Sequence, residues 1–375
     1  MISALLLPAA LAAEPCAPAG LLTPVRPAAP AAKPVPRGSC LNVRLELAGE
    51  ASQTTPAVGL SRQLALPRAR AELGLRSGGV ASARVAVEAV RSGGQTGYLG
   101  VDGESLLPRL QIAEARADWR RFGLAGAAGL IDDPWVVDGQ RTWGLPAVQP
   151  TFALSTAWME RADLGVWVAW TAPLDLATVS VAGMSGEGYR RRERNDGQDV
   201  SAMLTLRPLA PLVDDAERLA ISAVARSGSL GIEYARNHRV GLRISAEHPY
   251  AAGGVELLAG WGLDADADRE PGGLSAWART GRALPAVGWG RVDVARYDRT
   301  DADSAVTTLQ VGGGPALMSK AGGPPRVYLA LGYEGTRYGE SAAPLAGTSD
   351  ASATNTFFVQ LGANLRGDIA LEPSP

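Results

Sequence analysis

A few side chains in this sequence are of the types that catalyse reactions or bind metals, but their spacing excludes most such chemistry. His238 and His248 are ten residues apart and flank one alternating stretch, so they suit neither a metal pair nor a nucleophile triad. Asp264, Asp266 and Asp268 resemble a calcium-binding run but lack its central Gly and terminal Glu, so we interpret them as an acidic loop. The G-x-S-x-G, Walker and H-E-x-x-H motifs are absent. We therefore predict no enzymatic activity, no metal site and no cofactor.

The charged and aromatic residues of one long segment suggest a different role. Residues 132–163 have no clear period, are too long for an ordinary connection and contain three tryptophans, which argue against disorder. We predict that this segment folds inward and narrows a β-barrel pore. The alternative is a surface loop that packs its tryptophans on the barrel rim. Among its charged residues, Asp132, Asp133, Arg141, Glu160 and Arg161 are predicted to line the constriction, accompanied by Trp135, Trp143 and Trp158.

The stretches around this segment alternate between apolar residues and small, polar or charged residues. In 200–207, for example, Val200 and Leu204 share one face, whereas Ser201 and Arg207 lie on the other. This period of two predicts strands. The runs are close to ten residues long and have aromatic residues near their ends, which is typical of membrane barrels. No stretch offers 18 consecutive apolar residues, which excludes a helical membrane span.

We predict an all-β fold, a transmembrane antiparallel up-and-down β-barrel of about 16 strands (16–18). Pairing of the last run with the first would close the barrel, as a sheet in a bilayer requires. Most long connections then fall at one end; the exceptions are 208–217 and 314–325. The segment 227–237 is interpreted as a loop or strand extension, because a further strand would make the count odd. The strands are expected near 41–49, 65–75, 80–91, 108–120, 122–131, 163–171, 176–184, 199–207, 218–226, 238–247, 253–262, 273–281, 285–297, 305–313, 326–335 and 355–366.

A barrel of this size has a water-filled lumen, so polar residues of each strand face inward. Arg outnumbers acidic residues among the inward charges, and rings of Arg favour anions, so we predict a mild anion preference. For each residue the alternative is a solvated lumen charge paired with its neighbour. Besides the charged residues of the long segment, the predicted pore-lining residues are Arg84, Arg116, Asp118, Arg120, Arg207, Arg226, Arg243, Arg279 and Arg291.

The two ends of the chain differ from this pattern. Residues 1–13 have a short apolar core and a small-residue ending, which predicts a signal peptide. Residues 14–40 form a Pro/Ala-rich periplasmic segment, 41–366 the barrel, and 367–375 a C-terminal tail. After export, Cys16 and Cys40, the only cysteines, could form a disulfide. The net charge of -2 does not indicate nucleic-acid binding.

The stretch GLAGAAGLID, the Pro/Trp segment after it and ERADLG (160–165) resemble bacterial outer-membrane porins, most closely the phosphate-selective O/P-type group. In porins the third loop commonly folds into the lumen, and 132–162 occupies that place here. Two features depart from the group. The sequence RGDIALEPSP follows the last strand, where an aromatic end is usual, and the lysine-rich and arginine-ladder features of phosphate channels are not recognisable. Phosphate specificity is therefore not carried over.

These observations predict a passive diffusion channel of the bacterial outer membrane for small hydrophilic solutes or ions. Its partners would be those solutes, membrane lipids and lipopolysaccharide, and a homotrimer is compatible with the resemblance. The basic run 190–194 could attract anionic solutes or lipopolysaccharide phosphates, although a solvated loop is the simpler interpretation. The alternative function is a plugged barrel with an adhesion, export or structural role. A secreted all-β binding protein would instead have a polar outer face.

Overall fold

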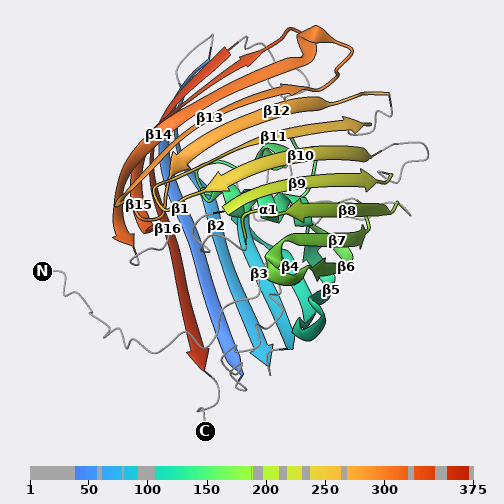
Figure 1. The fold of residues 1–375 in the computed structure, drawn as a ribbon. Coiled ribbons are helices and arrows are strands. Elements are labelled where there is room, and N and C mark those ends of the chain that lie inside the picture. Colours follow the sequence, from blue (N-terminus) through green and yellow to red (C-terminus); the bar gives the residue numbers. More distant parts are fainter. Residues whose placement is uncertain are drawn as a thin grey trace, which may run out of the picture.

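A computed structural model describes residues 39–56, 61–77, 80–91, 106–186, 188, 197–210, 218–229, 237–262, 268–319, 325–342 and 353–370. Sixteen strands form one closed barrel in which each strand pairs with its sequence neighbours (Figure 1). The strands are β1 (Cys40–Pro56), β2 (Ser61–Ser77), β3 (Ala81–Arg91), β4 (Leu106–Trp119), β5 (Leu124–Asp132), β6 (Ala162–Thr171), β7 (Ala177–Met184), β8 (Asp199–Leu206), β9 (Arg218–Ser227), β10 (His238–Glu247), β11 (Ala251–Trp261), β12 (Gly272–Thr280), β13 (Ala286–Arg296), β14 (Ala305–Ser319), β15 (Pro325–Tyr338) and β16 (Ala353–Ala370). The predicted fold class and count of sixteen are confirmed.

The barrel closes where the alternation predicted. β1 pairs antiparallel with β16 from Cys40 opposite Ala370 to Pro56 opposite Thr354. β9 pairs directly with β10, so no other strand of the described wall lies between them. Closure leaves no unpaired sheet edge, which is the condition that a bilayer imposes on a spanning sheet.

Several predicted boundaries were wrong by a few residues. β1 continues to Pro56 and β2 begins at Ser61, so the connection predicted at 50–64 is largely strand. β14 continues to Ser319, which shortens the long inner turn predicted at 314–325. β16 continues to Ala370, four residues into the predicted tail, because β1 starts at Cys40 and offers it a partner. Strand ends without clear alternation are thus set by their pairing partners.

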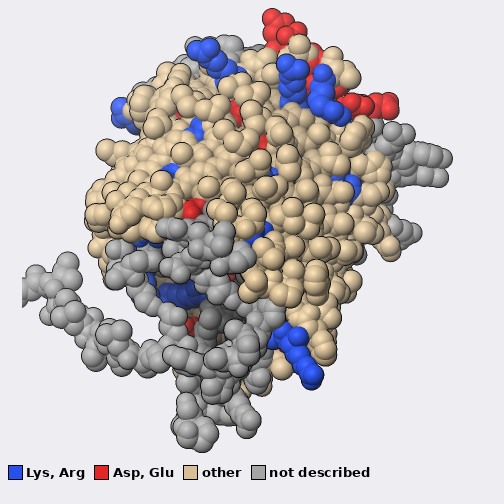
Figure 2. Space-filling view, viewed as in Figure 1, with Lys and Arg blue, Asp and Glu red and all other residues tan. Residues whose placement is uncertain are grey.

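The outer face of the wall is apolar. Large aliphatic and aromatic residues are exposed there on every side of the barrel, including Val166, Val181, Leu204, Leu331 and Phe357. On the face seen in Figure 2, charged side chains gather mainly toward one edge, and uncharged residues form most of the rest. A secreted protein with a polar outer face is therefore excluded, and the wall has the apolar band of a membrane-spanning barrel.

The wall has unequal strand lengths around the barrel. β1 and β2 have 17 residues each and β16 has 18, whereas β7 and β8 have eight each. The connections at the end of the barrel that carries 133–161, called here the outer end, are mostly longer than those at the opposite, inner end. None of the helices in the described part of the chain is long and apolar enough to cross a membrane.

Candidate functional site

The connection between β5 and β6, residues 133–161, is called here the inner segment because its side chains contact the inward faces of distant strands. It contains α1 (Pro134–Trp143) and the single turn α2 (Phe152–Ser155). Asp133 caps α1 by accepting a hydrogen bond from the Val136 amide at 3.0 Å, and Pro134 follows at the first helical position. Gly144 ends the helix in the left-handed conformation, with φ 74°. Figure 1 shows α1 between the walls of the barrel.

The first turn of α1 is held by charged groups on β10 and β11. Arg243 donates to Glu256 at 3.1 Å, to Asp138 at 3.2 Å and to the Trp135 carbonyl at 3.2 Å. Its guanidinium carbon lies 4.0 Å from the ring centroid of Trp135. The Trp135 indole in turn donates to Glu256 at 2.9 Å. Because Arg243 and Glu256 are buried and each has several partners, this network fixes the position of the helix start.

A second buried cation, Arg226 on β9, joins the helix cap to the wall. It donates to Asp133 at 3.2 Å and to Asp199 of β8 at 2.7 Å. Asn237 also donates to Asp199, at 2.8 Å. Burial raises the pKa of Asp133, and the nearby guanidinium of Arg226 opposes that shift. The cap residue is thus tied to two neighbouring strands through one arginine.

Three strands farther around the wall hold the rest of the inner segment through its backbone carbonyls. Arg279 of β12 donates to the Thr142 carbonyl at 3.3 Å. Arg291 of β13 donates to the Pro150 carbonyl at 2.6 Å. Gln360 of β16 donates to the Ala147 carbonyl at 2.9 Å. Since an irregular segment leaves carbonyls unpaired, these donors satisfy groups that water would otherwise have to reach.

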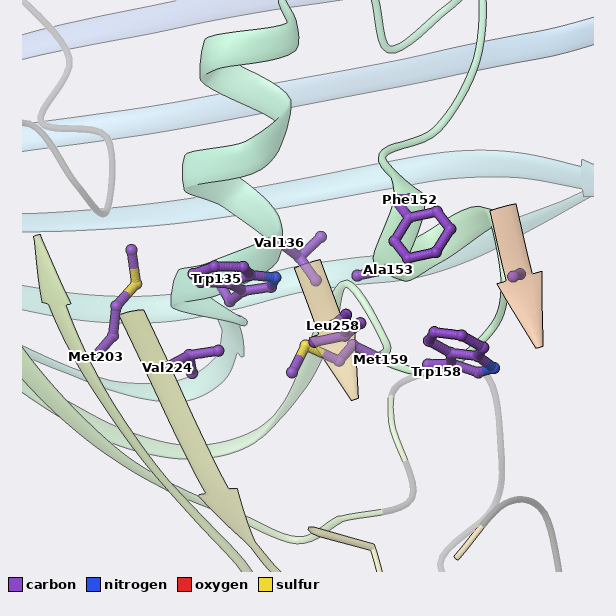
Figure 3. Packing of buried hydrophobic residues seen from close by; sticks show 10 residues of the cluster. Trp135, Val136, Phe152, Ala153, Trp158, Met159, Met203, Val224 and Leu258 are labelled. Atoms are coloured by element: carbon purple, nitrogen blue, oxygen red, sulfur yellow. The ribbon is translucent and has the colours of Figure 1, made fainter. Parts of the chain in front are cut away.

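Apolar side chains of the inner segment pack on the same part of the wall. The first cluster, shown in Figure 3, joins the segment to β8, β9, β11 and β13 and consists of Trp135, Val136, Phe152, Ala153, Trp158, Met159, Met203, Val224, Leu258 and Ala295. A second cluster joins Trp143 and Leu145 to inward aromatic residues of β12–β16, with Trp143 and Trp277 edge to face at 5.6 Å. The three tryptophans of the segment are therefore buried against the inner wall, and the rim position considered above is wrong.

On the opposite side of the inner segment lies a cavity of about 510 Å³. Its wall side is formed by the outer halves of β2, β3 and β4 and includes Arg68, Glu88, Arg109 and Gln111. Its other side is formed by the inner segment. The residues contributed by that side are Gln140, Pro146, Ala147, Val148, Pro150, Leu154 and Arg161.

A network of ion pairs lines the wall next to this cavity. Arg84 donates to Asp132 at 2.6 Å and pairs with Glu114 at 3.0 Å. Arg161 lies 3.5 Å from Asp132 and donates to Gln140 at 2.5 Å. Burial, reinforced by the neighbouring Arg70 and Arg68, lowers the pKa of Arg161 to about 9, so its guanidinium remains charged at neutral pH. The network therefore presents one basic side chain of the inner segment to the cavity.

The predicted site residues are divided among three places. Arg226, Arg243, Arg279 and Arg291 contact the inner segment, while Arg84, Asp132 and Arg161 belong to the network beside the cavity. Two other predicted arginines form ion pairs that involve neither the inner segment nor this network. Arg116 pairs with Asp118 at 2.6 Å, and Arg207 pairs with Asp175 at 2.9 Å.

Three further predicted residues, Arg120, Arg141 and Glu160, are not among the residues that line the cavity. Arg120 is not in a strand as predicted, because β4 ends at Trp119 and the chain turns through a 3-10 helix, Arg120–Phe122, closed by Gly123 in the left-handed conformation. Arg141 pairs with Asp138 within α1 at 3.3 Å. A Cβ built on Gly188 would contact Glu160, which places Glu160 near the connection after β7.

Sequence reasoning missed basic residues that line or adjoin the cavity, namely Arg68, Arg70 and Arg109. Arg68 donates to Glu46 at 2.7 Å, and Arg70 donates to Glu72 at 2.5 Å. Alternation in 65–75 predicted the strand, and the same period marks Arg68, Arg70 and Glu72 as sharing one face. Arg109 follows a proline near a strand start and a bulge in the pairing of β3 with β4, which obscures its direction.

Some predictions fall outside the described residues. These are the basic run 190–194, Asp264 and Asp266, and Cys16, the predicted partner of Cys40. Cys40 is buried at the start of β1, and its bridge to Cys16 stays a prediction. Among the described residues, no group of three or more His, Cys, Asp or Glu side chains could hold a metal ion.

Comparison with known proteins supports the fold. No protein-family model and no curated protein matches the chain. The anion-selective porin from Comamonas acidovorans matches with a TM-score of 0.60 and 10% identity, over 87% of this chain and 100% of that one. OmpF of Salmonella typhi, solved with daunomycin, matches with a TM-score of 0.60 and 9% identity, over 88% and 98%. The outer membrane channel DcaP of Acinetobacter baumannii matches with a TM-score of 0.56 and 8% identity, over 88% and 98%.

Identities this low establish likeness of fold alone. The chain has the sixteen-stranded barrel fold of bacterial outer-membrane porins. The narrower resemblance to the phosphate-selective O/P-type group stays a prediction.

Proposed function

We propose that this protein is a passive diffusion channel of the bacterial outer membrane, in which the inner segment narrows the lumen. One observation supports this most strongly. The inner segment is fixed to the wall from β8 to β16 by buried arginines and tryptophans, while a cavity of about 510 Å³ separates it from β2–β4. A segment held on one side and free of the opposite wall leaves an off-centre passage for solutes.

The charges around that passage favour anions. Its lining carries Arg68, Arg109 and Arg161 but one acidic residue, Glu88. Positive charges along a narrow passage attract anions and repel cations. The channel therefore passes anions in preference to cations, and its selectivity comes from these residues rather than from the arginines that bind the inner segment.

The alternative, a plugged barrel with an adhesion, export or structural role, is favoured by the amount of the lumen that side chains fill. Buried clusters occupy the interior beside β5–β7, β8–β13 and β12–β16. The two functions differ in whether ions cross the barrel.

Single-channel recording of the detergent-purified full chain in a planar bilayer separates them. Discrete conductance steps, with a reversal potential toward that of the anion in a salt gradient, are expected. Stable insertion without conductance steps would refute the channel function and support the plugged barrel. A reversal potential toward that of the cation would refute the anion preference but would not contradict the channel function.

We also propose that the channel is a homotrimer surrounded by lipids and lipopolysaccharide. One solved barrel of similar fold is the trimer form of OmpT, an outer membrane protein of Vibrio cholerae; it matches with a TM-score of 0.52 and 12% identity, over 88% of this chain and 100% of that one. On the outer wall here, β1, β2, β15 and β16 form a hollow of about 590 Å³ lined by Leu64, Leu331 and Phe357. Chemical cross-linking in detergent would yield a three-copy species, whereas a single-copy band at full cross-linking would exclude the trimer.

A further inference from the structure

The cavity between the inner segment and β2–β4 has two chemically different sides. The wall supplies Arg68, Arg109 and Gln63, which can donate hydrogen bonds, and one carboxylate, Glu88, which lies opposite Arg109 and accepts from Gln111 at 2.7 Å. Facing them, the inner segment supplies the apolar side chains of Pro146, Ala147, Val148, Pro150 and Leu154. A solute that contacts both sides must therefore combine an anionic group with an apolar body.

Arg109 is the residue best placed to bind the anionic group. It is half-buried, it lines the cavity, and it makes no hydrogen bond or ion pair with any part of the chain that the structure describes. Arg68, by contrast, donates to Glu46, and Arg161 is engaged with Asp132 and Gln140. A planar guanidinium that none of the described residues engages matches a carboxylate with two parallel hydrogen bonds.

The opposite side is kept in place by contacts outside the cavity. The Ala147 carbonyl accepts from Gln360, and the Pro150 carbonyl accepts from Arg291. Val148 and Leu154 pack against the two buried clusters of the inner segment. The apolar side is therefore a fixed surface, and it can contact an apolar group without rearrangement.

We propose that this cavity is a binding site for organic carboxylates with an aromatic or branched apolar body, held with the carboxylate on Arg109 and the body against Val148 and Leu154. This inference rests on the proposed channel function and names its solute class. The volume, about 510 Å³, lies in the range of roughly 300–1,000 Å³ that is usual for small-molecule sites. Inorganic phosphate has no apolar part and acetate has only one methyl group, so neither gains much from the apolar side.

Benzoate, acetate, inorganic phosphate and neutral benzamide at pH 7 are the probes. Calorimetry on the full chain in detergent measures their binding, and single-channel recording measures their block of chloride current. Benzoate is expected to bind about tenfold more tightly than acetate or phosphate, since only benzoate buries an apolar ring. Benzamide, which lacks the charge, is expected to bind more weakly than benzoate. Equal binding of benzoate, acetate and phosphate, or tighter binding of phosphate, would overturn the proposal.

Two variants test the two sides separately. Arg109→Gln should weaken benzoate and acetate alike, by about tenfold, because both lose the charge-assisted hydrogen bonds. Val148→Thr should weaken benzoate about threefold and leave acetate unchanged, because one methyl contact is lost. Arg337→Gln, an exposed arginine at the end of β15, is the matched control and should change neither. Unchanged benzoate binding in Arg109→Gln would refute the site, and calorimetry answers this even if the barrel fails to conduct.

Discussion

Arg243 shows how an inward-facing cation can serve the architecture of a pore. Its side chain is 1% exposed, and its guanidinium contacts two carboxylates and a carbonyl and lies over the ring of Trp135. Removing one partner from such a network leaves buried charges without compensation. Alternation along β10 indicates that Arg243 faces inward, but not that its partners come from another element. That is why the sequence could not separate arginines that hold the inner segment from those that line the cavity.

A substitution of Arg243 tests this structural role. Arg243→Lys keeps the charge but loses the planar fork, so the donors to Trp135, Asp138 and Glu256 cannot all be replaced. We expect the inner segment to loosen, with noisier current and a larger mean single-channel conductance. The exposed control Arg337→Lys should match the wild type in both. Wild-type noise and conductance in Arg243→Lys would contradict an anchoring role.

At the scale of elements, α1 is the part of the site that alternation could not reveal. The residues around it carry helix signals: Asp133 at the cap, Pro134 at the first position and Gly144 after the end. Pro134, one of the three prolines of the segment, starts this helix. The sixteen strands were predictable because each faces lipid on one side and the lumen on the other. α1 is a helix whose buried residues, such as Trp135, Val136 and Trp143, do not recur every second position, so a search for alternation passes over it.

The cap of α1 can be tested apart from its ion pair. Asp133→Ala removes the acceptor for the Val136 amide and should destabilise the helix by about 1–2 kcal/mol. Asp133→Asn keeps the cap, because Asn is as effective at this position, and removes only the charge facing Arg226. Hydrogen exchange should be faster in α1 of Asp133→Ala than in Asp133→Asn, with β11 unchanged in both. Equal exchange in the two variants would show that the cap contributes nothing.

The whole molecule depends on a wall with two chemically distinct faces. Val181 lies on the lipid side at the middle of β7, whereas Leu164 is exposed near the outer end of β6. Val181→Arg should destabilise the barrel by about 2–4 kcal/mol, and Leu164→Arg by about 0–1 kcal/mol, because the penalty falls with distance from the bilayer midplane. Denaturant unfolding in lipid vesicles measures both. Similar losses in the two variants would contradict the assigned membrane position.

The unequal strand lengths have a consequence for the surrounding bilayer. With a rise of about 3.4 Å per residue and a tilt near 45°, eight-residue strands such as β7 and β8 extend roughly 19 Å along the membrane normal. The 17 residues of β1 extend about 41 Å on the same basis. The wall at β7 and β8 is therefore shorter than the apolar band of about 25 Å that is usual for such barrels. Lipids beside β7 and β8 must thin locally, or the barrel must lean toward them, so folding should be faster and more complete in short-chain vesicles than in long-chain ones.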